Sequence, residues 1–369
     1  MTGGNSRPRE VCLVGMIAGG HSGVPRYAAK LVEAIDRAAP RFPELRIRFL
    51  TNPAGAVAAP VSSIESTVVR SPGSFANAGP ARLLLEHLSA RRARADLLHF
   101  FDTSGPVLAP GRPFVTTVHD VSALHGFRRV KNSYKHRLYP WALRSCSAAV
   151  AVSQAAKDDV VRDLGVDPEK ISVVHSGPGL GAPAALVEEE AKRDRVLLYV
   201  GNIGANKNLP LLIRAFGRAD PDARLIIAGR PGDGFAAVKE AIGATPAADR
   251  IELRLRADDA EVDGLYRTAA ALALPSSYEG FGFTPLEAMA RGCPVIESDI
   301  PALREVSGAG ALLVRHDDES GWADAIRRVL SDSDLQADLR SRGYATAAGF
   351  SWDTTASRIL EIFRAVELA

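Results

Sequence analysis

Short apolar runs alternate with segments of helical period along the whole chain. In the first half, the runs expected to form strands are Glu10–Met16, Arg46–Thr51, Leu97–Phe101, Phe114–His119, Ala148–Ser153 and Ile171–His175. The segments expected to form helices between them are Pro25–Arg37, Arg82–Arg92, Ser133–Arg144 and Gln154–Leu164. Strands that are apolar throughout are typical of parallel sheets covered on both faces. The pattern therefore predicts an α/β protein built from β-α-β units.

A Gly- and Pro-rich stretch at 177–193 interrupts the alternation and is expected to be a linker. A second series of strands follows at Val196–Val200, Arg224–Ala228, Ile251–Leu255, Ala271–Leu274, Pro294–Ile296 and Ala311–Val314. Its helices are expected at Pro210–Gly217, Glu261–Ala270, Ser331–Ala347 and Asp353–Val366. We therefore expect Rossmann-like domains over 1–176 and 194–350, with the helix in 351–369 packing back on the first domain. A ligand crevice is expected between the carboxyl ends of the two sheets.

Composition and charge indicate a globular protein with two cores. The 369 residues are 46% hydrophobic and 24% charged, and this length exceeds what one ordinary core organises. The 45 Lys and Arg side chains against 43 Asp and Glu leave a net charge of +2, so the bulk charge does not favour nucleic acid as a partner.

Cysteine usage and hydropathy indicate the compartment. Cys12, Cys146 and Cys293 are far apart, so neither a disulfide framework nor a thiolate zinc site is encoded. The first ten residues lack the basic flank and apolar run of a signal peptide, and no stretch reaches the roughly 18 apolar residues of a spanning helix. We expect a soluble, cytoplasmic protein.

The most informative passage is 278–290, Tyr-Glu-Gly-Phe-Gly-Phe-Thr-Pro-Leu-Glu-Ala-Met-Ala, between an apolar strand and a short helix. Thr284 as N-cap, Pro285 as first helical residue and Glu287 as third would form a capping box. That interpretation assigns Glu287 a purely structural role.

Other residues of this passage favour a ligand. The backbone amides of Phe281, Gly282 and Phe283 would point, with the helix dipole, at one spot suited to phosphate or sugar oxygens. Glu279 precedes the first turn, where capping does not explain it, and a hydroxyl-rich ligand would be a partner for its carboxylate. Two Glu residues eight positions apart are a weak signal alone, but the complete passage is much rarer.

The passage resembles the E-x7-E signature of the retaining GT-B glycosyltransferases, specifically glycosyltransferase family 4. Residues 198–209 resemble the family's phosphate loop, 118–120 and 151–154 resemble its first-domain motifs, and 294–296 and 301–306 also match. The nearest subgroup is mannosyltransferase-like. The resemblance implies the GT-B fold, in which two Rossmann-like domains face each other across a cleft.

The resemblance also implies roles for individual residues. Glu287 would bind the ribose hydroxyls of the nucleotide, and Glu279 would bind hydroxyls of the donor sugar without having to act as a nucleophile. The amides of Phe281, Gly282 and Phe283 would meet the sugar and diphosphate. Lys207, in the loop that starts at Gly201, would neutralise the leaving diphosphate, on which charge develops as the glycosidic bond breaks.

The phosphate loop departs from the family pattern at one point. The family usually places an Arg beside or shortly before the Lys, but Asn202 and Asn206 occupy the candidate positions here. Arg26 or Arg230 would compensate, or the diphosphate would rely on backbone amides. The two asparagines keep a different class of function open, that of a non-catalytic nucleotide-sugar-binding or scaffold protein.

Residues 19–27, Gly-Gly-His-Ser-Gly-Val-Pro-Arg-Tyr, follow the first strand and form a second glycine turn that opens a helix. The glycine spacing is not the dinucleotide fingerprint, which disfavours a dehydrogenase. Gly23 and Arg26 align with the family's Gly and Arg, with Gly20 as the alternative glycine, and Tyr27 is expected to pack the helix.

His119 ends a strand at the predicted crevice and is followed by Asp120. Taken alone, it is equally consistent with a histidine held by a backbone hydrogen bond. The resemblance implies instead that His119 lies close to the donor sugar and acceptor, where it would position the acceptor hydroxyl or take part in proton transfer.

Seven basic residues and no acidic one lie between Val121 and Lys157. We favour an ordinary explanation, a helix whose core-facing stripe is Tyr134, Leu138, Trp141 and Ser145 and whose basic side faces solvent. The alternatives are an acceptor site or a weak peripheral membrane contact through 128–144.

The sequence thus predicts a transferase that moves a hexose from a nucleotide diphosphate to an acceptor hydroxyl with retention of configuration. GDP-mannose is the favoured donor and UDP- or dTDP-hexoses are the alternatives, while the acceptor is a small molecule, lipid or glycan. A GT-B nucleotide-sugar epimerase or a phosphorylase-like enzyme would share the architecture. Since the family's fold typically needs no divalent ion, we expect no metal and no cofactor beyond the nucleotide-sugar co-substrate.

Overall fold

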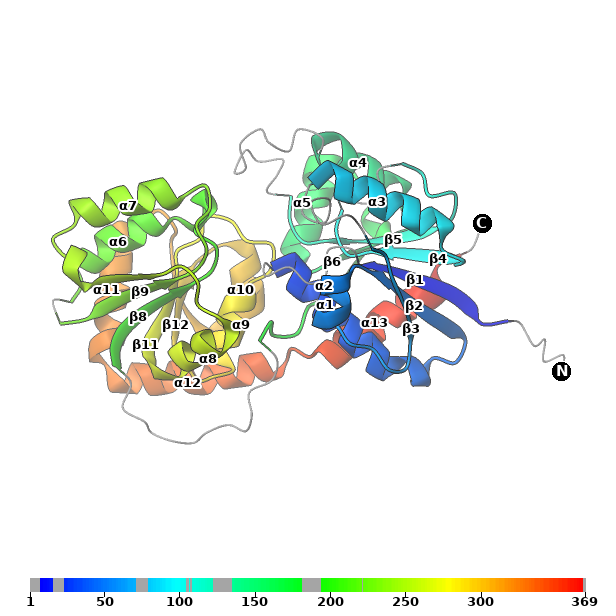
Figure 1. The fold of residues 1–369 in the computed structure, drawn as a ribbon. Coiled ribbons are helices and arrows are strands. Elements are labelled where there is room, and N and C mark those ends of the chain that lie inside the picture. The colour runs from blue at the N-terminus through cyan, green and yellow to red at the C-terminus, as the bar shows by residue number, and fades with distance from the viewer. Residues whose placement is uncertain are drawn as a thin grey trace. The chain divides into compact units, whose positions relative to one another are not determined.

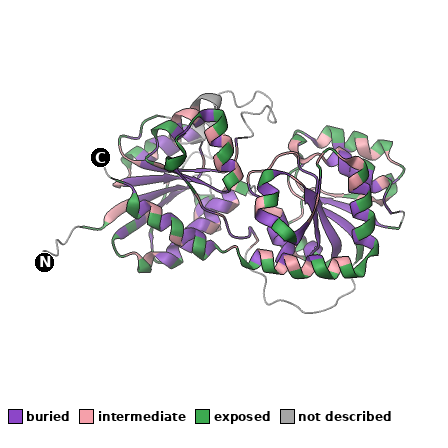
Figure 2. Cartoon of the chain, turned by 180° about the vertical axis from the view of Figure 1, so that it is seen from behind, coloured by how far each residue is buried: buried purple, intermediate pink, exposed green. Residues whose placement is uncertain are grey.

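The chain forms two compact units, each built around a parallel sheet (Figure 1). Unit 1 comprises Met1–Gly177 and Ser351–Ala369, and unit 2 comprises Pro178–Phe350. The computed structural model describes residues 7–15, 23–70, 79–103, 106, 108–121, 135–180, 194–220 and 222–367. In both units the inner strands are buried, whereas the edge strands β3 and β10 are not, and many exposed residues lie on the outer sides of the helices (Figure 2).

In the described part of unit 1, seven parallel strands lie in the order β3-β2-β1-β4-β5-β6-β7. The strands are β1 (Arg9–Gly15), β2 (Leu45–Thr51), β3 (Glu65–Val68), β4 (Leu97–Phe100), β5 (Phe114–Val118), β6 (Ala148–Ala151) and β7 (Ile171–Val173). The helices are α1 (Gly23–Ala38), α2 (Pro53–Ala58), α3 (Gly79–Arg92), α4 (Lys135–Ser145), α5 (Gln154–Leu164) and α13 (Trp352–Ala365). The helices cover both faces of this sheet (Figure 1).

In the described part of unit 2, six parallel strands lie in the order β10-β9-β8-β11-β12-β13. The strands are β8 (Asp194–Val200), β9 (Arg224–Ala228), β10 (Ile251–Arg254), β11 (Ala269–Leu274), β12 (Val295–Ser298) and β13 (Ala311–Val314). The helices are α6 (Leu209–Gly217), α7 (Phe235–Ala244), α8 (Asp259–Thr268), α9 (Phe283–Met289), α10 (Pro301–Ser307), α11 (Glu319–Ser331) and α12 (Ser333–Ala348). The strand order reverses between β8 and β11, so the loops that follow these two strands are neighbours at the carboxyl edge.

The predicted α/β class with two Rossmann-like halves is confirmed. The bounds of α5, β9 and β13 are those expected from the sequence. α5 illustrates why: Ser153 caps its first turn through a bond from the Ala156 amide, and Gly165 ends it at φ 60°. β3 was not predicted because its four residues are all exposed at the sheet edge and carry no apolar run.

The sequence predicted the wrong buried face for α4. Tyr139, Ala142 and Leu143 are buried, whereas Leu138 and Trp141 are only half-buried and Ser145 is exposed. The helix therefore turns a neighbouring stripe toward the core. Tyr134 and the basic residues at 128–131 lie outside the described residues.

The last helix, α13, completes the core of unit 1 by packing along α1. Trp352 and Phe363 on α13 are buried, and the Trp352 ring lies so close to Gly177 that a Cβ there would clash with it. Arg9 on β1 donates to three carbonyls at the end of the helix, those of Phe363, Arg364 and Val366. These contacts tie residues from the two ends of the chain into one core.

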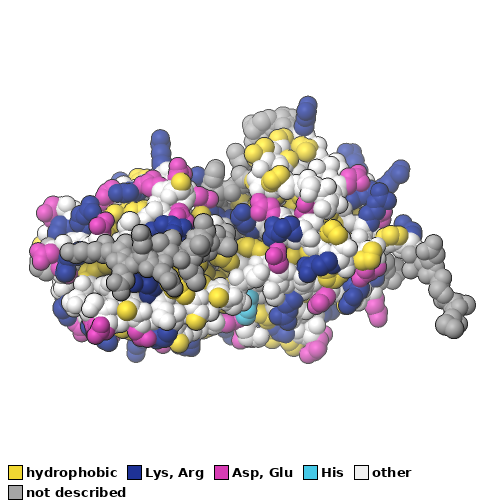
Figure 3. All heavy atoms as spheres, turned by 90° about the horizontal axis from the view of Figure 1, so that it is seen from below, with side chains coloured by type: hydrophobic (Ala, Val, Ile, Leu, Met, Phe, Trp, Pro, Cys, Tyr) yellow, Lys and Arg dark blue, Asp and Glu magenta, His cyan; other side chains and the backbone are white. Residues whose placement is uncertain are grey.

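The surface shows no large patch of one charge on the face drawn in Figure 3, and the three cysteines lie in the interior. Basic and acidic side chains lie next to one another over much of the face drawn in Figure 3. Cys12, Cys146 and Cys293 are buried thiols that take part in no disulfide among the described residues, and burial raises the pKa of the Cys12 thiol to about 12 and that of Cys146 to about 11. Among the described helices, none is both long and apolar enough to cross a bilayer.

Asp36 on α1 anchors the segment that leads into β3, and its replacement by asparagine is expected to destabilise unit 1. Its carboxylate accepts bonds from the amides of Ser62, Ser63 and Ile64 at 3.0, 2.7 and 2.9 Å. Burial alone would raise the pKa of Asp36, but these bonds outweigh it and hold the pKa below its ordinary value. We expect Asp36→Asn to lower the free energy of unfolding by about 1–3 kcal/mol at neutral pH, measured by urea denaturation.

Because the pKa of Asp36 is lower in the folded chain, its stabilisation is complete above the unfolded pKa near 4 and is lost as the pH falls through the folded pKa. The difference between wild type and Asp36→Asn should therefore shrink at about pH 3. The exposed Asp249 gives a matched control, since Asp249→Asn should change stability little at either pH. A deficit of the same size at both pH values would contradict the assignment.

Candidate functional site

The loops after β8 and β11 are joined by the side chain and backbone of Asn206. Asn206 Nδ2 donates to the Tyr278 carbonyl at 3.0 Å, and the Asn206 carbonyl accepts from the Ser277 amide at 2.9 Å. The two loops thus form one structure at the point where the strand order reverses, which is where α/β sheets bind ligands. Asn206, expected from the sequence to face the donor, uses its amide to hold the loops together.

Lys207 and Glu279 meet in this structure, although 72 residues separate them. Lys207 Nζ lies 2.5 Å from Glu279 Oε1, and the Ser276 hydroxyl donates to the same oxygen at 2.7 Å. The side chains of Lys207 and Glu279 are 19% and 14% exposed, so the pair is largely shielded yet reachable from solvent. An ammonium and a carboxylate are therefore held together at the carboxyl edge of unit 2.

Local backbone geometry fixes the position of Lys207. Lys207 ends a short 3₁₀ turn (Ala205–Lys207), and Asn208 then adopts φ 51°, the only positive φ of a non-glycine residue in the described ranges. Asn208 Nδ2 donates to the His316 carbonyl at 2.8 Å, which holds the strained residue in place. α6 then begins at Leu209, directly after Asn208.

Three glycines in the loop after β9 allow that loop to lie against the loop after β8. A Cβ on Gly229 would overlap the Gly201 carbonyl oxygen, and one on Gly232 would lie 2.8 Å from the Ile203 oxygen. A Cβ on Gly234 would lie 2.7 Å from the Gly204 carbonyl carbon. Backbone packs on backbone here, so these positions require glycine.

The capping box predicted for Thr284 and Glu287 is wrong. α9 starts at Phe283, its N-cap is Gly282 at φ 121°, and no side chain caps it. The helix starts two residues earlier than expected, at Phe283 instead of Pro285, because Gly282 tolerates this φ. Glu287 is 4% exposed, and its Oε2 accepts a bond from the Tyr266 hydroxyl at 3.0 Å.

Tyr266 on α8 is the residue that sequence reasoning missed as the partner of Glu287. Burial, and then the negative charge of Glu287, raise the pKa of Tyr266 well above its ordinary value, so the phenol stays a proton donor. Arg291, one turn after Glu287, donates to the Glu287 carbonyl at 3.1 Å and pairs with Asp263. The Glu287 carboxylate is therefore held by its surroundings and not by the helix end.

The remaining donor-site candidates of unit 2 lie in the loops that follow β8, β9 and β11. Phe281 is buried and its ring packs against Phe283 with centroids 5.4 Å apart. Asn202 is exposed, and its carbonyl accepts from the Tyr199 hydroxyl at 2.9 Å. Arg230, proposed as a substitute cation, is exposed on the adjacent loop, where its carbonyl accepts from the Ile203 amide at 2.9 Å.

The candidates of unit 1 lie at the carboxyl edge of its own sheet. His119 Nε2 is 2.8 Å from the Phe101 carbonyl, and its ring meets Tyr27 edge-on at 4.6 Å. Burial lowers the pKa of His119, although the carboxylates of Asp102 and Asp120 act in the opposite direction, so the imidazole is neutral near pH 7.

Of the glycine-turn candidates, Gly23 is the first residue of α1 and Arg26 lies in its first turn. Tyr27 is fully buried, as expected of a residue that packs the helix. Gly20 lies outside the described residues.

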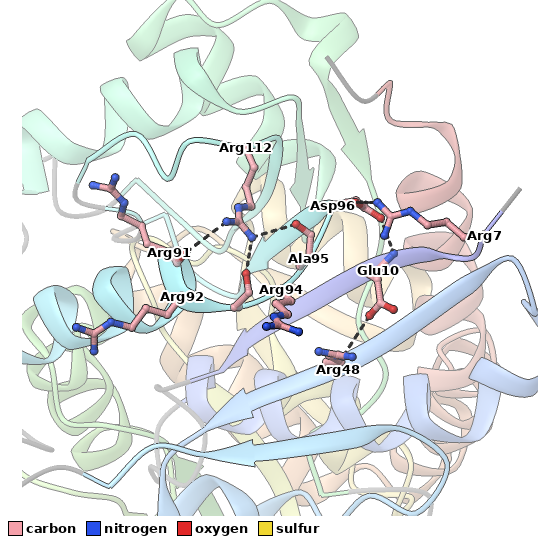
Figure 4. A pocket seen from close by; sticks show the side chains of 10 residues that line it. Arg7, Glu10, Arg48, Arg91, Arg92, Arg94, Ala95, Asp96 and Arg112 are labelled. Atoms are coloured by element: carbon pink, nitrogen blue, oxygen red, sulfur yellow. Dashed lines mark hydrogen bonds and ion pairs between the residues drawn. The ribbon is translucent and has the colours of Figure 1, made fainter.

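The cavity in Figure 4, of about 510 Å³, contains none of the predicted site residues. It lies at the amino edge of the sheet of unit 1 and is lined by six arginines with Glu10 and Asp96. Arg112 donates there to the carbonyls of Arg91, Ala93 and Ala95, where α3 ends. This basic cavity is therefore part of the structure that holds α3 and the start of β4.

No cluster of His, Cys, Asp and Glu suited to a metal occurs among the residues the structure describes.

Family models match both halves of the chain. The model described as Glycosyltransferase Family 4 matches residues 21–178, and the model described as Glycosyl transferases group 1 matches residues 186–346. The chain belongs to glycosyltransferase family 4. Together the two models account for most of this family 4 chain and include Lys207, Glu279 and Glu287 in the second match.

Curated relatives agree with this membership. The O-antigen chain mannosyltransferase RfbU of Salmonella typhimurium is 31% identical over 216 residues, which are 58% of this chain and 60% of the relative. A D-inositol 3-phosphate glycosyltransferase of Nocardia farcinica is 33% identical over 224 residues, covering 56% of this chain and 50% of the relative. The chain thus aligns with between half and three fifths of the length of these relatives.

Solved structures show the same fold over nearly the full chain. Anabaena Alr3699/HepE in complex with UDP-glucose superposes with a TM-score of 0.74 at 18% identity, covering 96% of this chain and 99% of that one. Sucrose-phosphate synthase from Thermosynechococcus elongatus gives 0.73 at 18% identity, covering 96% and 98%. The predicted GT-B fold is confirmed at the level of its two Rossmann-like halves.

Proposed function

We propose that the chain is a retaining glycosyltransferase that moves a hexose from a nucleotide-diphosphate sugar to an acceptor hydroxyl. The observation that carries the proposal is the 2.5 Å pairing of Lys207 with Glu279 on the two loops where the strand order of unit 2 reverses. Glu287 is buried on the helix that follows the second of these loops. Membership of family 4 supports the same activity.

In this proposal Lys207 and Glu279 exchange partners when the donor binds. The Lys207 ammonium turns to the diphosphate, which gains negative charge as the glycosidic bond breaks. The Glu279 carboxylate is then free to accept hydrogen bonds from sugar hydroxyls, and the Ser276 hydroxyl keeps it in position. Glu287, held by Tyr266, accepts from the ribose hydroxyls.

The proposed transfer is a front-face displacement. The acceptor oxygen forms a bond to the anomeric carbon as the carbon–oxygen bond to the diphosphate breaks. The acceptor proton passes to an oxygen of the leaving phosphate. His119 bonds a carbonyl through Nε2, which is therefore the protonated nitrogen, and its Nδ1 can accept a hydrogen bond that orients the acceptor hydroxyl.

For the donor and the acceptor we propose classes of molecule and not single compounds. GDP-mannose is favoured because RfbU is described as a mannosyltransferase, while the UDP-glucose complex of HepE supports testing UDP-hexoses and, beside them, dTDP-hexoses. The acceptor is a hydroxyl-bearing small molecule, lipid or glycan. Independence from metal, action in the cytoplasm and a membrane contact through 128–144 stay predictions.

Two other functions would use the same site. A non-catalytic nucleotide-sugar-binding protein is favoured by Asn202 and Asn206, because neither supplies the cation usual in the family and the Asn206 amide bonds a carbonyl. A GT-B nucleotide-sugar epimerase would also bind the donor. The former would bind without turnover, and the latter would convert the sugar without an acceptor.

Thermal-shift screening against GDP-mannose, UDP-glucose and dTDP-glucose, followed by product analysis with the stabilising donor, tests the proposal. We expect stabilisation by one nucleotide sugar and its slow hydrolysis or transfer with release of the nucleoside diphosphate. Binding without any turnover would favour the non-catalytic protein, and a changed sugar still attached to the nucleotide would favour the epimerase. Stabilisation by NAD alone would contradict all three.

Glu287→Ala is expected to raise the Kd for the donor by about 10- to 100-fold, since hydrogen bonds to a charged group contribute about 1.5–3 kcal/mol. The measurement is calorimetric titration of the nucleotide sugar found in the screen. The exposed Glu240 on α7 provides the control, and Glu240→Ala should bind as wild type does.

Because Glu287→Ala also leaves the Tyr266 hydroxyl without its acceptor, near-UV circular dichroism must establish that the variant is folded. Glu287→Gln keeps an oxygen for Tyr266 and removes the charge. An unchanged donor affinity in both folded variants would remove the ribose role from Glu287.

A further inference from the structure

A second buried glutamate, Glu297, lies near Glu279. Glu297 is the third residue of β12, in register with Leu274 of β11 and Leu313 of β13, in the middle of the carboxyl half of the sheet. Its side chain is fully buried, and in the described part of the chain neither carboxylate oxygen has a hydrogen-bond partner. Nothing in the proposed chemistry uses this carboxyl group.

Among the described residues, no cation compensates a negative charge on Glu297. The hydroxyls of Ser298, the next residue, and of Ser307 on α10 are also buried and without partners among the described residues. A buried carboxylate without a cation or several donors is strongly unfavourable, so such a group keeps its proton instead. Burial raises the pKa of Glu297 well above its ordinary value, while the nearby Ser307 hydroxyl acts in the opposite direction.

Strand register links Glu297 to the donor loop. Leu274, its partner on β11, is two residues before Ser276, whose hydroxyl holds Glu279. Neighbouring strands are about 4.8 Å apart, so Glu297 lies directly beside the start of this loop. The negative charge of Glu279 is close enough to add to the rise in the pKa of Glu297.

The other ionisable groups near β12 do not have the effect on the pKa of Glu297 that Glu279 has. Glu287 on α9 accepts from Tyr266, and α10 carries Arg304 and Glu305, while β13 has no ionisable residue. Among the described residues, Glu279 is the charged group that raises the pKa of Glu297, and Glu287, Arg304 and Glu305 do not shift it.

We propose that Glu297 is a positioning residue of the donor site: it stays an uncharged carboxylic acid beside Glu279, and its ionisation weakens nucleotide-sugar binding. An ionised Glu297 would place a second carboxylate near Glu279 and would repel it, which would disturb the position of the Glu279 carboxylate in the donor site. Glu297 thereby sets the alkaline limit of donor binding. The inference rests on the proposed function of Lys207 and Glu279.

Donor titrations against pH test the coupling. GDP-mannose and UDP-glucose, in separate series, are titrated into wild type and Glu297→Gln from about pH 6 to about pH 9. For the sugar that binds, we expect equal Kd values in the two proteins at the acid end. Toward the alkaline end the wild-type Kd should rise by about tenfold more than that of Glu297→Gln, since one pKa unit of coupling corresponds to tenfold. Parallel profiles of the two proteins would overturn the inference.

Asp220 supplies a matched control. It is a buried carboxylate of the same unit, lies before β9 and pairs with Arg195 on β8. Asp220→Asn should keep the wild-type pH profile of donor affinity. If it flattened the profile as Glu297→Gln does, the effect would be a general loss of charge and the inference would fail.

A second measurement does not depend on donor binding. Because the pKa of Glu297 is raised in the folded chain, wild type should lose stability relative to Glu297→Gln as the pH rises from about 4.5 toward the folded pKa, by up to tenfold in the folding constant per pH unit. Infrared difference spectra between the two proteins at neutral pH should contain the C=O band of a protonated carboxylic acid.

These outcomes separate the inference from the proposed function. If no nucleotide sugar binds to any variant, the function is wrong while the infrared band still reports the proton on Glu297. If a donor binds but the band is absent, the inference is wrong and the function stands. Should Glu297→Gln not fold, the wild-type band and Glu297→Ala, which also removes the titrating group, provide the same comparison.

Discussion

Replacing Lys207 with alanine is expected to lower kcat for sugar transfer by about 10²- to 10³-fold, the usual loss when one group that stabilises transition-state charge is removed. Lys207 is the cation that pairs with Glu279 in the loop after β8, and Asn202 and Asn206 supply no second one. The measurement is the initial rate at saturating donor, with the nucleotide sugar found by thermal shift. Because the effect is on charge that develops during bond breaking, kcat should fall more than donor affinity.

Lys239 provides the control within the same unit. It lies on α7, with its ammonium 5.3 Å from the centre of the Phe235 ring, and takes no part in the site. Lys239→Ala should transfer sugar at close to the wild-type rate. An intact kcat in a folded Lys207→Ala protein would show that the leaving diphosphate does not depend on this ammonium.

The substitution Gly229→Ala is expected to lower the free energy of unfolding of unit 2 by at least about 3 kcal/mol, and to abolish donor binding in any protein that still folds. The new Cβ would overlap the Gly201 carbonyl oxygen, and backbone on both sides leaves nothing that can move aside cheaply. The loop after β8 would have to shift, and Lys207 with it. Urea denaturation followed by donor titration measures both effects.

Gly243 is the matched control for this prediction. It lies in α7, and a Cβ there would have no atom within 4 Å. Gly243→Ala should leave stability unchanged or raise it by up to about 1 kcal/mol, because alanine favours the helix. Equal stabilities of the two variants would mean that the loops after β8 and β9 do not pack as described.

Much of the fold follows from local signals in the sequence. The apolar run of β9 and the cap residues Ser153 and Gly165 of α5 set their elements residue by residue. Local signals fail where tertiary context decides: β3 is exposed, and the N-terminus of α9 depends on the φ that Gly282 adopts. Thr284 and Glu287 fit a capping box in sequence alone, yet Glu287 lies beside Tyr266 once α8 and α9 are packed.

The candidate site was predicted in part for the same reason. The resemblance to the family identified Lys207 and Glu279, but their pairing depends on the neighbouring positions of β8 and β11. Nothing in the apolar run around Glu297 signalled a buried acid without partners, because burial and partners are properties of the fold. The sequence also did not show that the Asn206 amide joins two loops, since its partner Tyr278 lies 72 residues away.

The position of α13 has a consequence for how the protein is made. Strands β1 to β7 leave the ribosome well before Trp352–Ala365, the helix that covers α1 and receives Arg9. The first unit therefore waits with an uncovered apolar face while the second unit, which is continuous in sequence, is synthesised and can fold. Nascent chains should thus depend on chaperones during this interval, and a fragment ending near residue 177 should aggregate when expressed alone.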